Sequence, residues 1–196
     1  QKIIDGWQTE MPDVWLPGGE VWLTPRSDRV LKVRFGGWIS QHEENGHLVT
    51  EYHDDTVIEA MPYDLLISGG GSEIVSTLRL WKARSVNTFD MKSFSQGDYT
   101  KAMEKNNNAE VITKVLYPSD DHTQGKTLRL KQQYFLVSAS IQNIINDHIK
   151  RHKDIRTLPD YAAIHINDTH PALCIPELMR IMMDDLGLGW DEAWSI

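Results

Sequence analysis

A change of hydrophobic period near residue 95 constrains the fold of this chain more than any other feature. Before it, apolar residues alternate with polar ones, as in Leu31–Phe35, which is typical of β-strands. After it, apolar residues recur every three to four positions, which indicates amphipathic helices. A chain of 196 residues is long enough to bury a core in one or two domains. We therefore expect a mixed α/β fold that begins with a β-rich segment.

The β-rich segment contains one clear hairpin signal. Asn45-Gly46 separates the strand-like runs 38–39 and 48–52, and both residue types tolerate the positive φ of a tight turn. Residues 57–67 and 74–81 are further predicted strands. Between them, Gly69-Gly70-Gly71 is interpreted as a flexible turn, because a phosphate loop should open onto a helix and a strand-like run follows here.

The second half predicts three helices. The first covers 97–114 with a polar middle at residues 106–108, and a longer one covers 128–148. The third covers 176–186 and ends at Gly187 and Gly189. Residues 190–196 form a last amphipathic run.

The apolar run 162–166 is predicted to be a strand, and the polar residues Asn167, Asp168, Thr169 and His170 follow it. A strand, a polar loop and a helix form an α/β unit, in which ligands bind beyond the carboxyl end of the strand. The alternative is that Asp168 or Thr169 only caps the next helix. The residues alone leave both interpretations open.

A second polar loop covers residues 117–126 and joins two helices. Turn-forming residues explain most of its composition. Alternatively, the carboxylates of Asp120 and Asp121, beside Tyr117 and His122, could bind sugar hydroxyls while the aromatic ring stacks on a sugar.

His148 and His152 stand four residues apart on a helix, as metal ligands can, but no third ligand is evident. They are interpreted as a solvated helix end. His165 is expected to be a core histidine, and Cys174 a buried structural residue. The tryptophans at 7, 15 and 22 receive no assignment.

The net charge of −8 argues against binding to nucleic acids or to an anionic membrane surface and leaves uncharged ligands such as sugars open. The single cysteine excludes an internal disulfide and favours a reducing compartment. The apolar runs are too short to span a bilayer. Gln1 is no start methionine, and the chain stops within an amphipathic run, so both ends are expected to be cut.

Eight segments in order resemble the α-glucan phosphorylase family, which includes the glycogen and maltodextrin phosphorylases. They are QKI (1–3), GWQ (6–8), AMPYD (60–64), LRLW (78–81), VLYP (115–118), GKTLRLKQQYF (125–135), AIHINDTHPAL (163–173) and IPELMR (175–180). The matches cover nearly the whole chain.

The resemblance implies part of the N-terminal Rossmann-like domain of a two-domain, GT-B-like glycosyltransferase. It divides the chain into a β-rich segment (1–90), a tower-like helix, gate loop and long helix (91–150), and a strand–loop–helix unit at the active-site cleft (151–196). It implies phosphorolysis of α-1,4-glucan to glucose 1-phosphate with retention, in a cytoplasmic homodimer that contacts its partner through the helix near residues 97–114. The cofactor would be pyridoxal 5′-phosphate, bound by a C-terminal domain absent from this chain, which would be inactive alone.

Carried onto this sequence, Asp168 resembles an acid that lines the catalytic cleft, with His170 close to the sugar. Asp120 and Asp121 resemble the tip of a mobile gate over the substrate channel, Tyr117 an aromatic platform for the glucan, and Arg129 a partner of the gate. An oxocarbenium-like state is stabilised by nearby carboxylates, and a lid excludes water.

Four positions depart from the family pattern. Asp121 stands where Asn is common, and its charge would repel phosphate. Asn146-Asp147 replace an arginine pair that binds an activating nucleotide in regulated animal enzymes, and His122 replaces an aromatic residue. These departures resemble an unregulated, bacterial-type enzyme.

Two other functions remain as alternatives. One is a GT-B glycosyltransferase that uses a sugar nucleotide, and the other is a non-catalytic carbohydrate-binding module.

Overall fold

A computed structural model describes residues 2–9, 11–14, 22–44, 46–86 and 89–196. They form two compact units, each made of two stretches of the chain. The first unit contains residues 1–32 and 58–132, and the second contains 33–57 and 133–196. The β-rich beginning and the helical remainder confirm the mixed α/β class predicted from the change of period.

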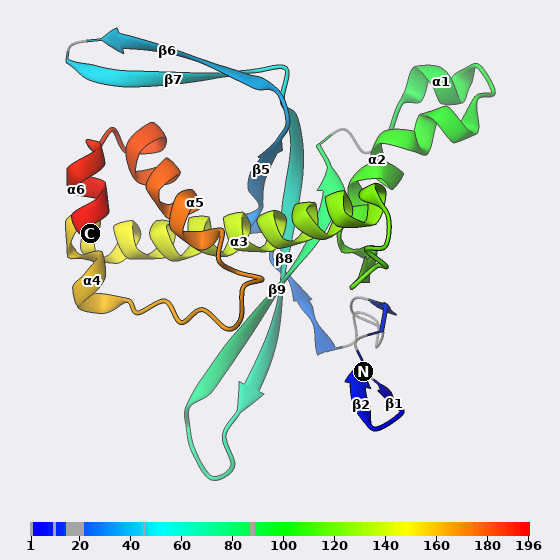
Figure 1. Ribbon diagram of the computed structural model, residues 1–196, viewed down its shortest axis with the longest axis horizontal. Coiled ribbons are helices and arrows are strands. Elements are labelled where there is room, and N and C mark those ends of the chain that lie inside the picture. The colour runs from blue at the N-terminus through cyan, green and yellow to red at the C-terminus, as the bar shows by residue number, and fades with distance from the viewer. Residues whose placement is uncertain (1, 10, 15–21, 45, 87–88) are drawn as a thin grey trace. The chain divides into compact units, whose positions relative to one another are not determined.

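A long antiparallel ribbon organises the first unit (Figure 1). Strand β8 (Thr56–Ser68) pairs with β9 (Val75–Ser85) in a register that runs from Ile58 opposite Ser85 to Ser68 opposite Val75. The short strand β4 (Thr24–Pro25) also pairs with β8, and the short helix η2 (Ser27–Arg29) follows β4. The glycines 69–71 form the turn of the ribbon, where Gly71 has a φ of +67°, so the predicted turn is confirmed.

Helix α2 (Tyr99–Lys114) packs on β9 and closes the core of the first unit. The Ala83 N–H donates to the Thr113 hydroxyl at 3.0 Å and ties the strand to the helix. Asp98 caps α2, and helix α1 (Met91–Ser95) precedes it. The buried hydrophobic residues are Ile58, Ala60, Met61, Tyr63, Trp81, Ala83, Ala102, Ala109 and Ile112. The helix predicted over 97–114 is therefore confirmed.

Two small strand pairs complete the first unit. Strands β1 (Lys2–Ile4) and β2 (Trp7–Thr9) form a hairpin, and β10 (Val115–Leu116) pairs with β3 (Asp13–Val14). Gln1 and Trp15, which the sequence analysis named, lie outside the described residues.

Strand β5 (Leu31–Phe35) starts in the first unit and ends in the second, where β6 (Trp38–Glu44) and β7 (His47–His53) form a hairpin. Trp38 lies opposite His53, and Glu44 opposite His47. Gly46 has a φ of +79°, as the turn requires, while Asn45 lies outside the described residues. The predicted hairpin is confirmed.

Helix α3 (Thr123–His152) starts in the first unit and supplies the main core helix of the second. After it come η3 (Ile155–Thr157), α4 (Leu158–Tyr161), α5 (Cys174–Arg180), the π-helical turn η4 (Ile181–Asp185) and α6 (Trp190–Ser195). The helix predicted over 176–186 appears as α5 and η4, and Gly187 ends it with a φ of +72°. The main buried residues here are Val137, Ile141, Ile145, Ile155, Leu158, Cys174, Met179, Ile181, Met182 and Ala193. Cys174 is buried as predicted.

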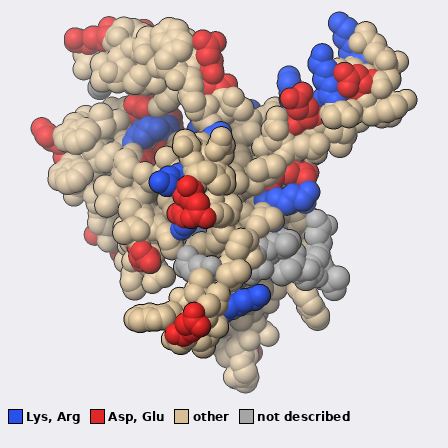
Figure 2. Space-filling view, turned by 45° about the vertical axis from the view of Figure 1, so that its right-hand side comes forward, with Lys and Arg blue, Asp and Glu red and all other residues tan. Residues whose placement is uncertain are grey.

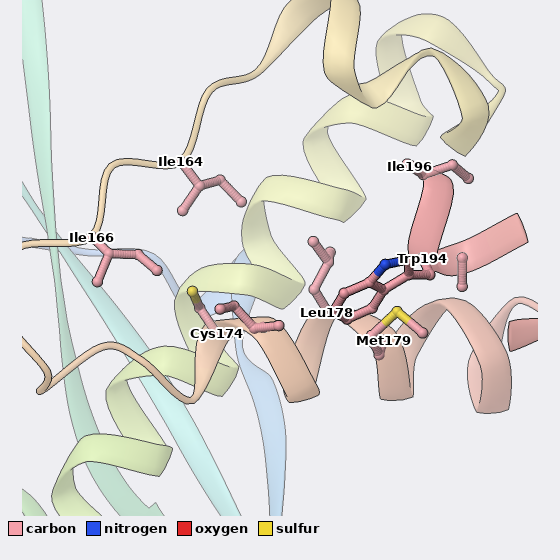
Figure 3. A pocket seen from close by; sticks show the side chains of 9 residues that line it. Ile164, Ile166, Cys174, Leu178, Met179, Trp194 and Ile196 are labelled. Carbon is pink, nitrogen blue, oxygen red and sulfur yellow. The ribbon is translucent and has the colours of Figure 1, made fainter. Parts of the chain in front are cut away.

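The strand predicted over 162–166 is wrong as a paired strand. Ala162 has the extended values φ −135° and ψ 132°, yet residues 162–166 belong to no ladder in the described part of the chain. A strand is defined by hydrogen bonds to a neighbour, and an apolar sequence cannot show whether a neighbour is present. The extended backbone still places Ile164 and Ile166 toward the same hollow (Figure 3).

Two predictions about histidines are also wrong. His148 is buried rather than solvated, and its Nε2 lies 2.9 Å from the Asp154 carbonyl oxygen. Its ring stacks on that of His152, which stacks on Tyr161, because α4 folds back along the end of α3. His165 is exposed rather than buried, because its segment pairs with no strand in the part of the chain that the structure describes.

Charged residues of both signs are interspersed on the face that Figure 2 shows. Among the described residues, no helix combines the length and apolar character needed to cross a bilayer.

Candidate functional site

The loop between β10 and α3 holds most of the predicted substrate-binding residues. Arg129, two turns into α3, places its guanidinium 5.7 Å from the centre of the Tyr117 ring. The same guanidinium donates through Nη1 to Asp120 Oδ2 at 2.7 Å. Tyr117 has a φ of +54°, an uncommon conformation for an aromatic residue. The first unit therefore brings Tyr117, Asp120 and Arg129 into one cluster.

Asp121 follows in the same loop and makes a local contact. The Ser119 hydroxyl donates to Asp121 Oδ2 at 2.7 Å. The carboxylates of Asp120 and Asp121 thus have different partners, a guanidinium and a hydroxyl.

The loop folds tightly against the first turn of α3. The Gly125 N–H donates to His122 Nδ1 at 3.0 Å, and the Lys126 N–H donates to the His122 carbonyl oxygen at 3.1 Å. His122 is therefore the N-cap of α3. A Cβ on Gly125 would stand 1.8 Å from the Ser119 carbonyl oxygen, so only glycine fits there.

Sequence reasoning missed Ser119 and Gly125. The glycine in the first turn of a long helix could have indicated this contact. Glycine destabilises a helix there, so its presence suggests that another backbone segment packs against it. Gln132 was also missed: its Nε2 donates to the Val115 carbonyl oxygen at 2.7 Å and joins α3 to the base of the loop.

Asp168 lies in the second unit, in an exposed loop with a φ of +65°. Its carboxylate accepts from the backbone N–H and the hydroxyl of Thr169. These hydrogen bonds, and then the nearby His170, lower the pKa of Asp168 below its usual value. The group is therefore ionised at neutral pH.

The helix-capping interpretation of Asp168 and Thr169 is wrong. Helix α5 begins only at Cys174, and its N-cap Leu173 makes no side-chain cap. Between them, the Ala172 N–H donates to the Thr169 carbonyl oxygen at 3.0 Å, which forms a separate turn. His170 is half-buried in this turn. The Asp168 carboxylate is thus free of the structural role that the alternative gave it.

A buried polar cluster fixes α5, which follows this turn, against α3. Glu177 is 3% exposed and accepts from the hydroxyls of Ser138 at 2.6 Å and Tyr134 at 3.2 Å. Arg180 donates to Glu177 through Nε at 2.8 Å and Nη2 at 3.0 Å. These partners hold α5 and α3 in one arrangement, because the loss of any of them would leave the buried Glu177 carboxylate poorly solvated. The position of residues 168–170 relative to α3 depends on this cluster.

A hollow of about 280 Å³ lies between residues 164–166, α5 and α6 (Figure 3). Its lining is apolar: Ile164, Ile166, Cys174, Ile175, Leu178, Met179, Ala193, Trp194 and Ile196. It contains none of the predicted site residues, and its lining side chains are mainly apolar and include no carboxylate or amide to bind sugar hydroxyls. We do not assign it to a carbohydrate.

The described residues contain no group of three His, Cys, Asp or Glu side chains that could hold a metal ion. They also do not fit pyridoxal 5′-phosphate. A site for this cofactor needs an enclosed lysine. No lysine is among the buried residues of the described part of the chain, and none lines the hollow.

The model of the carbohydrate phosphorylase family matches residues 1–196. The chain belongs to this family. It is 42% identical over 196 residues to a glycogen phosphorylase of Bacillus subtilis (strain 168). It is 45% identical over 204 residues to the brain form of glycogen phosphorylase of Rattus norvegicus and 44% over 196 residues to a glycogen phosphorylase of Pasteurella multocida (strain Pm70).

All of this carbohydrate phosphorylase chain is covered in these comparisons, but only 24% of each of the three relatives. The family that the sequence resembles is therefore confirmed.

Proposed function

We propose that this chain is part of an enzyme that cleaves α-1,4-linked glucan with inorganic phosphate and releases glucose 1-phosphate with retention. The observation that carries the proposal is membership of the carbohydrate phosphorylase family along the whole chain. The glycogen phosphorylases that it resembles are named for this class of reaction.

In this proposal the cluster of Tyr117, Asp120 and Arg129 is a gate over the substrate channel. The Tyr117 ring, 37% exposed, offers a face on which a glucose unit can stack. The ion pair between Asp120 and Arg129 holds the loop in one position, and its exchange for another partner would move the loop. Asp121 adds a second carboxylate at the tip of the gate.

Asp168 and His170 are proposed to face the sugar at the cleft. Positive charge develops at the anomeric carbon as the glycosidic bond breaks. The exposed and ionised Asp168 carboxylate can stabilise this charge electrostatically. His170 is proposed to hydrogen-bond the sugar that Asp168 faces.

Pyridoxal 5′-phosphate is proposed to bind in a Rossmann-like C-terminal domain outside this chain. Its phosphate group would take part in proton transfer. Together with that domain, the present chain would form a GT-B-like enzyme, with residues 151–196 at the cleft. We propose a cytoplasmic location, which the single free thiol, Cys174, supports.

A homodimer that forms through α2 is part of the proposal. Tyr99, Met103 and Val111 are 60%, 38% and 47% exposed on this helix, although they are apolar or aromatic. Their spacing of four and eight residues places them on one side of the helix. The other side packs on β9 through Ala102, Ala109 and Ile112. An exposed apolar stripe of this kind favours association with a second copy.

Assays of a full-length protein that contains this chain test the proposal. We expect release of glucose 1-phosphate from glycogen, starch or maltodextrin in phosphate buffer, and the near-ultraviolet and visible absorbance of bound pyridoxal phosphate. Glucan extension that requires a sugar nucleotide, with no cofactor absorbance, would instead support the glycosyltransferase alternative. Glucan binding by the 196-residue chain alone, with no activity at full length, would support a carbohydrate-binding module.

A further inference from the structure

His122 occupies the junction between the proposed gate and α3. Its Nδ1 accepts from the Gly125 N–H at 3.0 Å, and its carbonyl oxygen accepts from the Lys126 N–H at 3.1 Å. Nδ1 can accept only without a proton, so the proton of the neutral ring is on Nε2. Histidine is not among the preferred N-cap residues, which are Ser, Thr, Asp and Asn. The cap at this position therefore calls for an explanation beyond helix stability.

The cap is coupled to the position of the two carboxylates. Asp120 and Asp121 lie directly before His122, and the Ser119 carbonyl oxygen packs on Gly125, where a Cβ would come within 1.8 Å. Gly125 thus makes two contacts with the loop: it packs against the Ser119 carbonyl oxygen, and its N–H donates to His122 Nδ1. A shift of the imidazole frees that N–H and loosens the contact with Ser119. At its tip the loop then keeps the Asp120–Arg129 ion pair as a tie to α3, and the contacts of Arg129 with Tyr117 and of Gln132 with Val115 remain at its base.

We propose that His122 is a positioning residue of the gate: its cap on Gly125 holds Asp120 and Asp121 in place over the substrate channel. This inference rests on the proposed phosphorolysis. A gate that closes firmly excludes water. In phosphorolysis a phosphate oxygen bonds to the anomeric carbon as the glycosidic bond breaks, and the departing glucan oxygen takes up a proton. In hydrolysis a water oxygen bonds to the anomeric carbon instead, a proton of the water goes to the glucan oxygen, and glucose is released. A loosened gate therefore raises the share of glucose among the products.

Two substitutions distinguish the hydrogen bond to the Gly125 N–H from other effects of replacing the His122 imidazole. In His122→Asn, the side-chain oxygen branches from Cγ, as Nδ1 does, and can accept from Gly125. In His122→Gln, the amide lies one carbon further out, near the position of Nε2, and the cap is lost. Gln124→Ala is a control, because it truncates an exposed side chain of the same turn and leaves the cap intact.

Hydrogen exchange and product analysis are measured on the full-length protein. For the peptide covering 117–126, we expect His122→Gln to exchange up to about tenfold faster, which corresponds to about 1.4 kcal/mol and lies in the range of a lost helix cap. The glucose share should rise several-fold. His122→Asn and Gln124→Ala should match the unchanged protein in both measurements.

Gly125→Ala provides an independent route, because its Cβ forces the Ser119 carbonyl away. We expect it to raise both exchange and the glucose share, as His122→Gln does. The proposal is overturned if His122→Gln leaves both quantities unchanged, or if His122→Asn behaves like His122→Gln. If the unchanged protein releases no glucose 1-phosphate, the proposed function fails, and the exchange data alone decide whether the cap fixes the loop.

Discussion

Two of the predicted site residues, Tyr117 and Asp168, have left-handed backbone conformations, with φ of +54° and +65°. Such conformations are uncommon outside glycine, more so for an aromatic residue than for aspartate. In folded proteins they concentrate at functional sites, where the surrounding structure maintains them. Both residues lie in loops. Hydrophobic periodicity does not report backbone angles in loops, so the sequence could not have indicated these conformations.

Asp168→Asn tests the charge of this residue without a change of shape. Asparagine tolerates the left-handed conformation as well as aspartate does, and no helix cap is lost. We expect a stability change within about 0.5 kcal/mol, as for an exposed position. For the full-length enzyme, kcat/KM should fall by roughly ten- to a thousand-fold, or about 1.4 to 4 kcal/mol.

Initial rates and melting temperature should be measured on the same preparation of this variant. Unchanged activity together with a lower melting temperature would show that Asp168 is structural, and the site assignment would then be wrong.

Among the elements, the β8–β9 ribbon contains an ion pair with a buried carboxylate, that of Asp64. Asp64 lies opposite Arg79 in the register and accepts from its Nε and Nη2, both at 2.7 Å. The hydrogen bond to Arg79, and then the charges of Arg79 and Arg26, lower the pKa of Asp64. The Asp64 side chain is 6% exposed, so a neutral side chain here would leave Arg79 without its main buried partner.

Asp64→Asn should destabilise the ribbon by about 2 kcal/mol, the size of a charge-assisted hydrogen bond. Because the folded pKa of Asp64 is depressed, its contribution is present above the unfolded pKa and is lost as the pH falls through the folded pKa. The protection factors of β8 and β9 against hydrogen exchange, which correct for the slower intrinsic exchange in acid, should therefore fall in acid for the unchanged protein, while the Asn variant lacks this part of the change. Equal acid responses in both proteins would contradict the assignment.

Asn146 and Asp147, which concern regulation by nucleotides, lie in helix α3. We propose, from the family resemblance, that Asn146 and Asp147 replace an arginine pair that binds an activating nucleotide. Asp147 accepts a long hydrogen bond of 3.4 Å from Asn143, and its charge repels a phosphate. A phosphate site needs charge-assisted donors. Activity of the full-length enzyme should therefore stay flat across an AMP titration, and a several-fold activation would mean that AMP binds elsewhere.

At the scale of the whole molecule, this chain by itself should have no phosphorolytic activity. The described residues offer no enclosed lysine for the cofactor, and the chain spans 24% of the length of its glycogen phosphorylase relatives. The measurement is glucose 1-phosphate release by the purified 196-residue chain with glucan and phosphate. Release at rates comparable to those of a full-length phosphorylase would overturn this expectation.

The proposed dimer is also a property of the whole molecule. The full-length protein should sediment as a dimer at micromolar concentration. Met103→Glu places a charge in the exposed apolar stripe of α2 and should shift the protein toward monomer. Asn108→Glu adds the same charge outside the stripe and should leave the dimer intact. A monomer for the unchanged protein, or equal effects of both substitutions, would argue against contact through α2.

The sequence by itself determined the class of fold, the family and the main elements, because hydrophobic period and turn chemistry are local properties. The hairpin of β6 and β7, the ribbon of β8 and β9, and helices α2 and α3 follow from them. Tertiary structure decided what depends on neighbours distant in sequence. Among the described residues, the run 162–166 pairs with no strand, His148 is buried, and Asp168 caps no helix. The cap of His122 on Gly125 and the close approach of Ser119 also emerge only when the loop folds against α3, since no period or motif records a backbone contact.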